Sequence, residues 1–369
     1  MKKFKHHLKD ILSIGFSLIL VVSLIAYPSN ISQSTLTGIN YCIKILVPSL
    51  FPFMFLSRFI ASQGLPPFLK KPLNYITKTI FYLPGAATPA IILSLIGGYP
   101  VGASSAAVLI SQKEINEEQL QRLMCFTVNA GPAFIVSVVG CSLLKNPFLG
   151  YLILIVQIFV SLSTGIILGI ISRIKKQPFY VKRSSNLSKI NFSESLISAT
   201  SQASESIIMM CGLIIVFTDF ISILKSLKVF ELISNLCTRA NVKPESLISL
   251  LLSFFEVTGA CLYSVKNYAC IPLISFILAY GGVCTHLQII SILKNFKMNY
   301  NQFHLFRILN GIFSSLIVYL LLSFFETSAP VFISTVETCQ VGNSTSIPGS
   351  IALIFLCLFL TMSIKKTGT

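Results

Sequence analysis

The chain has 369 residues, of which 54% are hydrophobic and only 11% are charged, and its mean hydropathy is +0.81. Soluble globular proteins carry about 25% charged residues, so this composition excludes a soluble domain and predicts an all-α polytopic membrane protein. A net charge of +16 would suggest a nucleic-acid partner for a soluble chain. Here the basic residues lie in short loops between apolar segments, so they indicate membrane topology, and we expect the lipid bilayer and no nucleic acid as a partner.

The N-terminal segment, residues 1–38, begins with the basic leader MKKFKHHLKD and continues into an apolar run. We expect a retained transmembrane helix followed by an external loop. A cleaved signal peptide stays open as the alternative, since Leu24 and Ala26 form a weak cleavage pattern.

Eight segments are long enough to cross a bilayer at about twenty residues per crossing. They lie near residues 11–27, 39–61, 125–145, 149–172, 205–226, 269–292, 305–325 and 348–364. Two further apolar segments, 86–110 and 246–265, are predicted to be re-entrant helical hairpins that enter and leave by the same face.

The first of these hairpins contains the run IILSLIGGYPVGASSAA, whose middle holds Gly98, Tyr99, Pro100 and Gly102. Proline removes a backbone donor and glycine weakens a helix, so two half-helices meeting at an irregular break are expected. Such a break lies in protein or beside a wet cavity, because unpaired backbone groups facing lipid are costly. A proline kink in an ordinary spanning helix is the alternative.

Loop charges favour the hairpins. With both of them re-entrant, 21 of the 28 Lys and Arg residues lie inside, and both termini are cytoplasmic. With two crossings instead, the basic loop RIKKQPFYVKRSSNLSK would lie outside. The segment 173–204 is therefore predicted to be a basic cytoplasmic linker, and 326–369 an external loop, a last transmembrane helix and a cytoplasmic tail.

This topology makes residues 39–172 and 205–325 two repeats of opposite orientation, each a span, a hairpin and two more spans. Inverted repeats with paired broken helices are typical of secondary transporters, which bind substrate near the bilayer midplane. Between the first hairpin and the next span, the run QKEINEEQLQRL predicts a helix capped by Asn116, with Glu117 and Glu118 in its first turn. We expect that helix to lie along the inner membrane surface.

Each repeat has a second interruption in the span after its hairpin. FTVNAGPAFI holds Asn129 and Gly131, and LAYGGVCTHLQ holds Gly282, Thr285, His286 and Gln288. Half-helix N-termini offer free N–H groups and positive potential, which suits a carboxylate or phosphate. The predicted substrate-binding residues are Gly98, Tyr99, Pro100, Gly102, Ser104, Asn129, Gly131, Thr258, Gly259, Gly282, Thr285, His286 and Gln288. Packing between helices is the alternative role for Ser104 and Asn129. His286 has two alternatives to a substrate contact: it titrates, or it satisfies a neighbouring helix.

Glu256 lies at the expected tip of the second hairpin, and an intramembrane carboxylate is a functional residue by default. We predict that Glu256 couples transport to a proton or a sodium ion. A carboxylate that contacts water or Lys266 near an interface is the alternative.

No catalytic pattern is present: HExxH, GxSxG and paired Asp motifs are all missing from the sequence. We therefore expect no enzyme activity, no cofactor and no metal site. The ten cysteines show no CxxC pairing and are expected to be small buried hydrophobic residues. A homo-oligomer stays open.

The runs SLIGGYPVGA, FTVNAGPAFI and ILAYGGVCTHLQ together resemble the YlbJ (SpoVV) family of sporulation integral membrane proteins, within the nucleoside-recognition or Gate-domain group. The resemblance covers about Tyr41 to Phe325. It implies a transporter in the outer forespore membrane of a sporulating bacterium that moves dipicolinate (pyridine-2,6-dicarboxylate) from mother cell toward forespore. The group is in turn similar to concentrative nucleoside transporters, whose re-entrant hairpins bind substrate.

We therefore predict a transporter of a small organic anion, with dipicolinate as the substrate that the resemblance implies. Two alternatives stay open: a nucleoside transporter, and a non-transporting assembly protein of the spore envelope in which the broken helices are packing devices.

Overall fold

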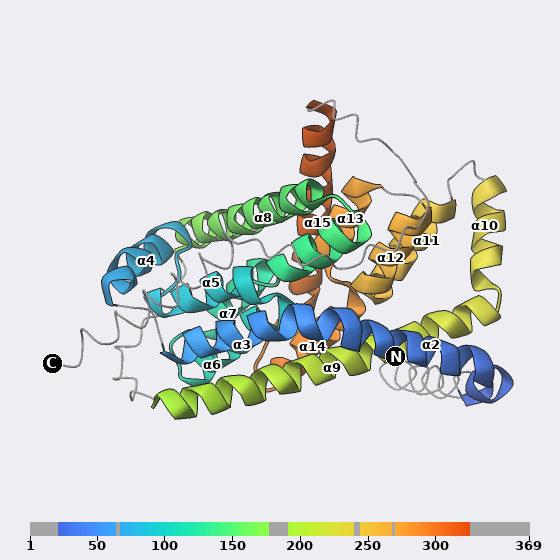
Figure 1. Ribbon diagram of the computed structural model, residues 1–369. Helices are drawn as coiled ribbons and strands as arrows, with labels where there is room; N and C mark the ends of the chain where they lie inside the picture. Colours follow the sequence, from blue (N-terminus) through green and yellow to red (C-terminus); the bar gives the residue numbers. More distant parts are fainter. Residues whose placement is uncertain (1–20, 64–66, 177–190, 240–243, 268–269, 325–369) are drawn as a thin grey trace, which may run out of the picture.

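The computed structural model describes residues 21–63, 67–176, 191–239, 244–267 and 270–324 (Figure 1). These residues form helices and no strand, which confirms the all-α polytopic prediction. Most of the predicted helix 11–27 and all of the segment 326–369 lie outside the described residues. The helices are α2 (Pro28–Tyr41), η1 (Cys42–Leu46), α3 (Val47–Gln63), α4 (Pro67–Ile80), η2 (Gly85–Ala87), α5 (Thr88–Gly97), α6 (Tyr99–Ser111), α7 (Glu117–Phe126), η3 (Ala133–Leu143), α8 (Pro147–Ile174), α9 (Phe192–Ser226), α10 (Val229–Arg239), α11 (Pro244–Phe255), α12 (Val257–Asn267), α13 (Ile271–Tyr280), α14 (Gly282–Ile292) and α15 (Tyr300–Phe324).

Four helical segments in the described part of the chain are long and apolar enough to cross a membrane. They are α8, α9, the broken helix Ile271–Ile292 and α15. A fifth is counted if Pro72–Ile80 and Gly85–Gly97, which meet at 106°, form one broken span. The total number of crossings and the inverted repeat stay predictions.

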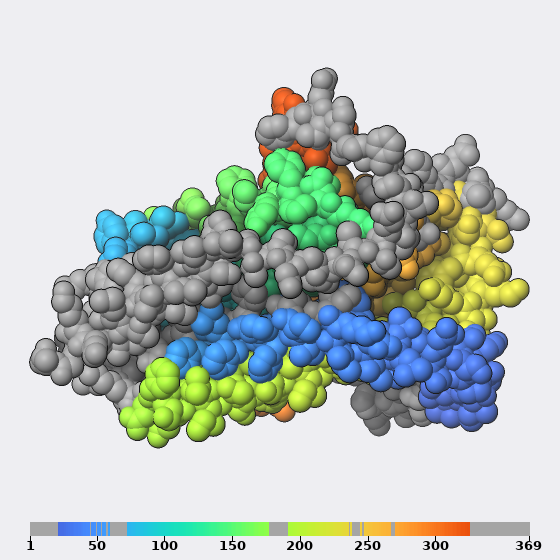
Figure 2. Space-filling model, in the orientation of Figure 1, coloured from blue at the N-terminus to red at the C-terminus, as the bar shows by residue number. Residues whose placement is uncertain are grey.

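Two expected loops are helical. Residues 28–38 belong to α2, and residues 192–204 begin α9. The run PSNISQSTLTGINY is polar, so the sequence alone did not predict the helix α2. This helix is stabilised by its packing against α9. There the hydroxyls of Ser34 and Thr35 donate to the carboxylate of Asp219 at 2.5 and 2.9 Å. Figures 1 and 2 show α2, α3 and α9 running side by side across one face of the molecule.

Small residues allow close helix packing elsewhere, as is common in membranes. A Cβ at Gly140 of η3 would lie 2.8 Å from the Cα of Gly150 on α8, so these two helices touch through their backbones. The opposite side of α8 carries exposed Phe148, Tyr151 and Ile155 at helical spacing. An exposed apolar face of this kind suits lipid tails.

The predicted capped helix after the first hairpin is confirmed as α7. The Asn116 side chain accepts from the backbone N–H of Gln119 at 2.8 Å, and the Gln119 side chain accepts from Asn116 N–H at 3.0 Å, which forms a capping box. Its expected position at the inner membrane surface stays a prediction. Within the protein, α7 packs against α6, α8 and α15, so that residues 119–126 are all buried and the Arg122 guanidinium donates to the carbonyl of Tyr82 at 3.0 Å.

Candidate substrate pocket

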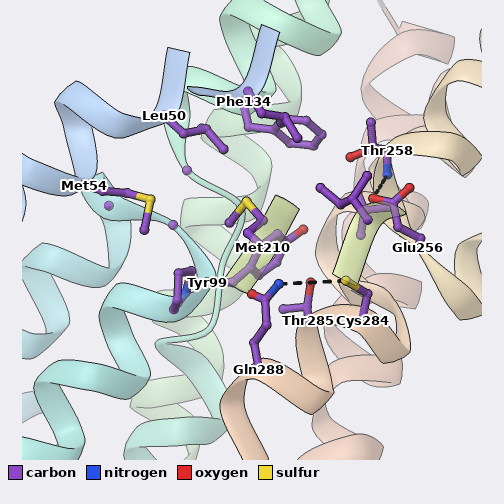
Figure 3. A pocket seen from close by; sticks show the side chains of 17 residues that line it. Leu50, Met54, Tyr99, Phe134, Met210, Glu256, Thr258, Cys284, Thr285 and Gln288 are labelled. Carbon is purple, nitrogen blue, oxygen red and sulfur yellow. Dashed lines mark hydrogen bonds between the residues drawn. The ribbon is translucent and has the colours of Figure 1, made fainter. Parts of the chain in front are cut away.

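A pocket lies where broken helices meet (Figure 3). Its lining comes from the break between α5 and α6, the break between α11 and α12, the start of α14, the segment before η3, and one side each of α3 and α9. Figure 3 shows Tyr99, Glu256 and Gln288 around this space, although they are far apart in the sequence. The first hairpin and the second half of the chain therefore meet at one site.

Gly98 forms the break between α5 and α6. Its φ of 83° lies in the region that favours glycine. A Cβ at this position would stand 3.2 Å from the amide nitrogen of Gly131, so the break lies directly against the segment before η3. The hydroxyl of Tyr99 donates to the carbonyl oxygen of Leu278 on α13 at 2.5 Å. Pro100 falls in the first turn of α6, where a missing N–H leaves no helical bond unmade.

Residues 127–131 join α7 to η3 without helical structure. The amide of Asn129 donates to the carbonyl of Phe126 and to the hydroxyl of Ser161, both at 2.9 Å. Protein surrounds this irregular segment, and its side chains are buried. It therefore satisfies the condition for non-helical backbone at membrane depth.

Glu256 forms the break between α11 and α12. Its buried carboxylate accepts from the backbone N–H of Thr258 at 2.6 Å and of Gly259 at 2.5 Å (Figure 3). The carboxylate thus caps the first turn of α12. Among the residues that line the pocket, Glu256 has the one charged side chain.

Gly281 and Gly282, with φ of 90° and 70°, form the break between α13 and α14. The carbonyls that end α13 have side-chain partners from outside the pocket. The guanidinium of Arg307 on α15 donates to the carbonyls of Ala279 and Tyr280, and the Nε2 atom of His286 lies 3.0 Å from the Tyr280 oxygen. The polar ends of a broken helix are stable in this interior because these groups satisfy them.

The first two turns of α14 present Cys284, Thr285 and Gln288 to the pocket (Figure 3). Four helix N-termini, those of α6, α12, α14 and η3, contribute residues to the lining. Those of α6, α14 and η3 carry no side-chain cap. Each helix N-terminus has a positive potential equivalent to about half an elementary charge. The pocket is therefore suited to an anion.

The remaining lining is apolar. Leu46, Leu50 and Met54 follow one another at four-residue intervals along η1 and α3, and Met210 and Ile214 do so on α9. Residues four apart share one face of a helix, so each helix presents a continuous apolar surface. A ligand with an apolar body and polar ends would match such a site.

In the described ranges, no group of three or more His, Cys, Asp or Glu residues could hold a metal ion.

Comparison with known proteins gives one informative relative. No protein-family model matches the chain, and no solved structure matches it. The chain is 24% identical over 338 residues to the sporulation integral membrane protein YlbJ of Bacillus subtilis (strain 168). The matched region covers 85% of this chain and 83% of that protein. This similarity supports assignment of the chain to the YlbJ family. The similarity and the long apolar helices indicate an integral membrane protein and are consistent with a membrane role in sporulation.

The predicted substrate-binding residues fall into two groups. Eight, with the coupling candidate included, line the pocket: Gly98, Tyr99, Pro100, Gly131, Glu256, Thr258, Thr285 and Gln288. Six others do not belong to its lining, and each has a neighbour outside it: Gly102 packs on the Thr127 carbonyl, Ser104 accepts from Arg58, Asn129 bonds to Ser161, the Gly259 N–H donates to Glu256, Gly282 packs on the Ser253 carbonyl, and His286 contacts His304.

Sequence reasoning missed the pocket wall from α3 and α9, because its leucine, isoleucine and methionine side chains look like any lipid-facing or packed residue. Among the buried cations, it also missed Arg58 and Arg307, which are 9% and 0% exposed. The loop charges assign both residues to the inner face of the membrane, because they lie near the predicted ends of spans. Their positions within α3 and α15 place them in the protein interior.

Proposed function

We propose that this protein is a secondary transporter of a small organic anion, with dipicolinate as the substrate. The observation that carries the proposal is the convergence of four helix N-termini on one pocket, three of them without a side-chain cap. A helix N-terminus stabilises a nearby negative charge by up to about 2 kcal/mol in a partly buried setting. A planar dicarboxylate could direct its two carboxylates to opposite N-termini while its ring contacts the apolar wall of α3 and α9.

Glu256 supports proton coupling within this proposal. An ionised Glu256 would repel an anion in the same pocket by about 3 kcal/mol at a separation of about 5 Å and an effective dielectric constant of about 20. A proton taken up with the substrate removes that repulsion. A sodium ion beside the carboxylate is the alternative coupling ion. The protein would then move its substrate without a chemical step.

The proposed location is the outer forespore membrane of a sporulating bacterium, with both termini cytoplasmic. Support for the cellular role comes from the sporulation integral membrane protein to which the chain is similar. Support for the orientation comes from the basic loops.

The test is uptake of radiolabelled dipicolinate by proteoliposomes that contain the purified full-length protein, under an imposed proton or sodium gradient. We expect accumulation above that of empty liposomes. Absence of uptake under either gradient would refute the proposal. Uptake of radiolabelled uridine that unlabelled uridine inhibits and unlabelled dipicolinate does not would point to nucleoside transport instead.

A further inference from the structure

Arg58 holds a buried positive charge in the interior of α3. Its guanidinium donates to the side-chain oxygens of Gln202 at 2.7 Å and Ser206 at 2.7 Å on α9, and of Ser104 at 3.2 Å on α6. All three acceptors are neutral. We call these four residues the Arg58 cluster.

No carboxylate forms an ion pair with Arg58 within the described part of the chain, where the ion pair found joins Lys228 to Glu231. Glu205, on α9 between two members of the cluster, attracts the Arg58 charge from an exposed position without contacting it. The Nε atom of Arg58 is buried and has no hydrogen-bond partner. A buried charge without an ion-pair partner is costly, and basic residues inside membrane proteins are typical of substrate and ion pathways.

The cluster has a fixed relation to the substrate pocket. Arg58 lies four residues after Met54 on α3, Ser104 four residues after Pro100 on α6, and Ser206 four residues before Met210 on α9. Met54, Pro100 and Met210 all line the pocket. Residues four apart on a helix share a face and are about 6 Å apart along its axis. The Arg58 cluster therefore lies one helical turn from the pocket on all three helices.

On all three helices, the step from the pocket to the Arg58 cluster leads toward the same side of the protein. This side holds the end of α3, the end of α6 and the start of α9. These helix ends adjoin the loops whose charges predict the inner face of the membrane. An anion moving between the inner face and the pocket would meet the Arg58 cluster on this side.

We propose that the Arg58 cluster is a second anion-binding site, which takes the carboxylate group of an organic anion on its way between the inner face and the substrate pocket. The planar guanidinium matches a carboxylate with two parallel hydrogen bonds. The hydroxyls of Ser104 and Ser206 can donate to the same carboxylate once it replaces them on the guanidinium. Passage of the substrate through this site rests on the proposed transport function.

The test compares Gln202→Glu with wild-type protein in proteoliposomes. This near-isosteric change keeps an acceptor on Arg58 and neutralises its charge. A purely structural Arg58 would gain an ion pair and keep its transport kinetics. The anion site predicts instead that KM for dipicolinate rises at least tenfold, while the apparent melting temperature stays equal or increases. Gln302→Glu, the same change on α15 near the predicted inner face, is the control and should leave KM within twofold.

A KM within twofold of wild type in a stable Gln202→Glu protein would overturn the proposal. Arg58→Lys adds a second measurement, because it keeps the charge but loses the planar fork, and we expect an intermediate KM. If wild-type liposomes accumulate no dipicolinate, the proposed function fails, and equilibrium binding of radiolabelled dipicolinate and benzoate to the purified protein then decides the site separately. Loss of one of two bound equivalents in Gln202→Glu would support the site, whereas unchanged binding, or no binding to wild type, would overturn it.

Discussion

Gly102 offers a sharp test of how the first hairpin packs, because a single methyl group cannot fit there. An ideal Cβ at this position would lie 2.1 Å from the carbonyl oxygen of Thr127 and 3.0 Å from the Cβ of Ser94. Nonbonded atoms need about 3.5 Å. The substitution Gly102→Ala therefore forces α6 and the irregular segment 127–131 apart by about 1.4 Å.

The expected loss of stability follows from that overlap. Inserting a methyl group into a packed interior costs about 1–3 kcal/mol. Alanine in place of glycine in an open helix gains about 1 kcal/mol, and Gly212 on α9 provides this control, since its Cβ would meet nothing within 4 Å. Gly102→Ala should consequently be less stable than Gly212→Ala by about 2–4 kcal/mol.

The assay is the apparent melting temperature of both purified variants in detergent, with dipicolinate uptake as the second readout. We expect Gly102→Ala to melt roughly 5 °C or more below Gly212→Ala. Its uptake should fall because Gly98 and Pro100, at the start of the displaced helix, line the pocket. Equal melting temperatures for the two variants would refute the close approach of α6 to Thr127.

Three further substitutions test the pocket and its supports. Glu256→Gln removes the titrating carboxylate, so uptake should continue down a dipicolinate gradient but lose its response to a proton gradient; proton-driven accumulation by this variant would contradict the coupling role. Tyr99→Phe loses the hydrogen bond to the Leu278 carbonyl and should destabilise the protein by about 1 kcal/mol, measured as a lower melting temperature. Arg307→Ala leaves the carbonyls that end α13 without their guanidinium partner and should cost about 1–3 kcal/mol for each carbonyl left unsatisfied, so a normal yield and melting temperature would argue against that support.

The breaks in the helices could be predicted from the sequence because glycine and proline have local effects. Gly98 and Gly281 adopt positive φ whatever surrounds them, and Asn116 caps the helix that follows it. The same local reasoning brought Thr285 and Gln288 to the pocket, since both follow a double glycine.

Other features depend on tertiary contacts that a single sequence does not display. Asn129 next to a break looks like a ligand, yet its amide bonds to Ser161, thirty-two residues away. Arg58 lies close to a predicted span boundary, and only its packing against α6 and α9 shows that the charge is internal. Met210 has no local mark of its role, because any apolar residue of a membrane helix could occupy the same position.

The hydrogen bond from Tyr99 to Leu278 joins residues 179 positions apart and connects the first hairpin to α13. Alternating access requires some parts of a transporter to rock against others. Motion that separated α6 from α13 would break this bond and leave two buried polar groups without partners. We therefore expect the break at Gly98 and the end of α13 to move together as a single rigid body. The hinges would lie in segments outside this pair.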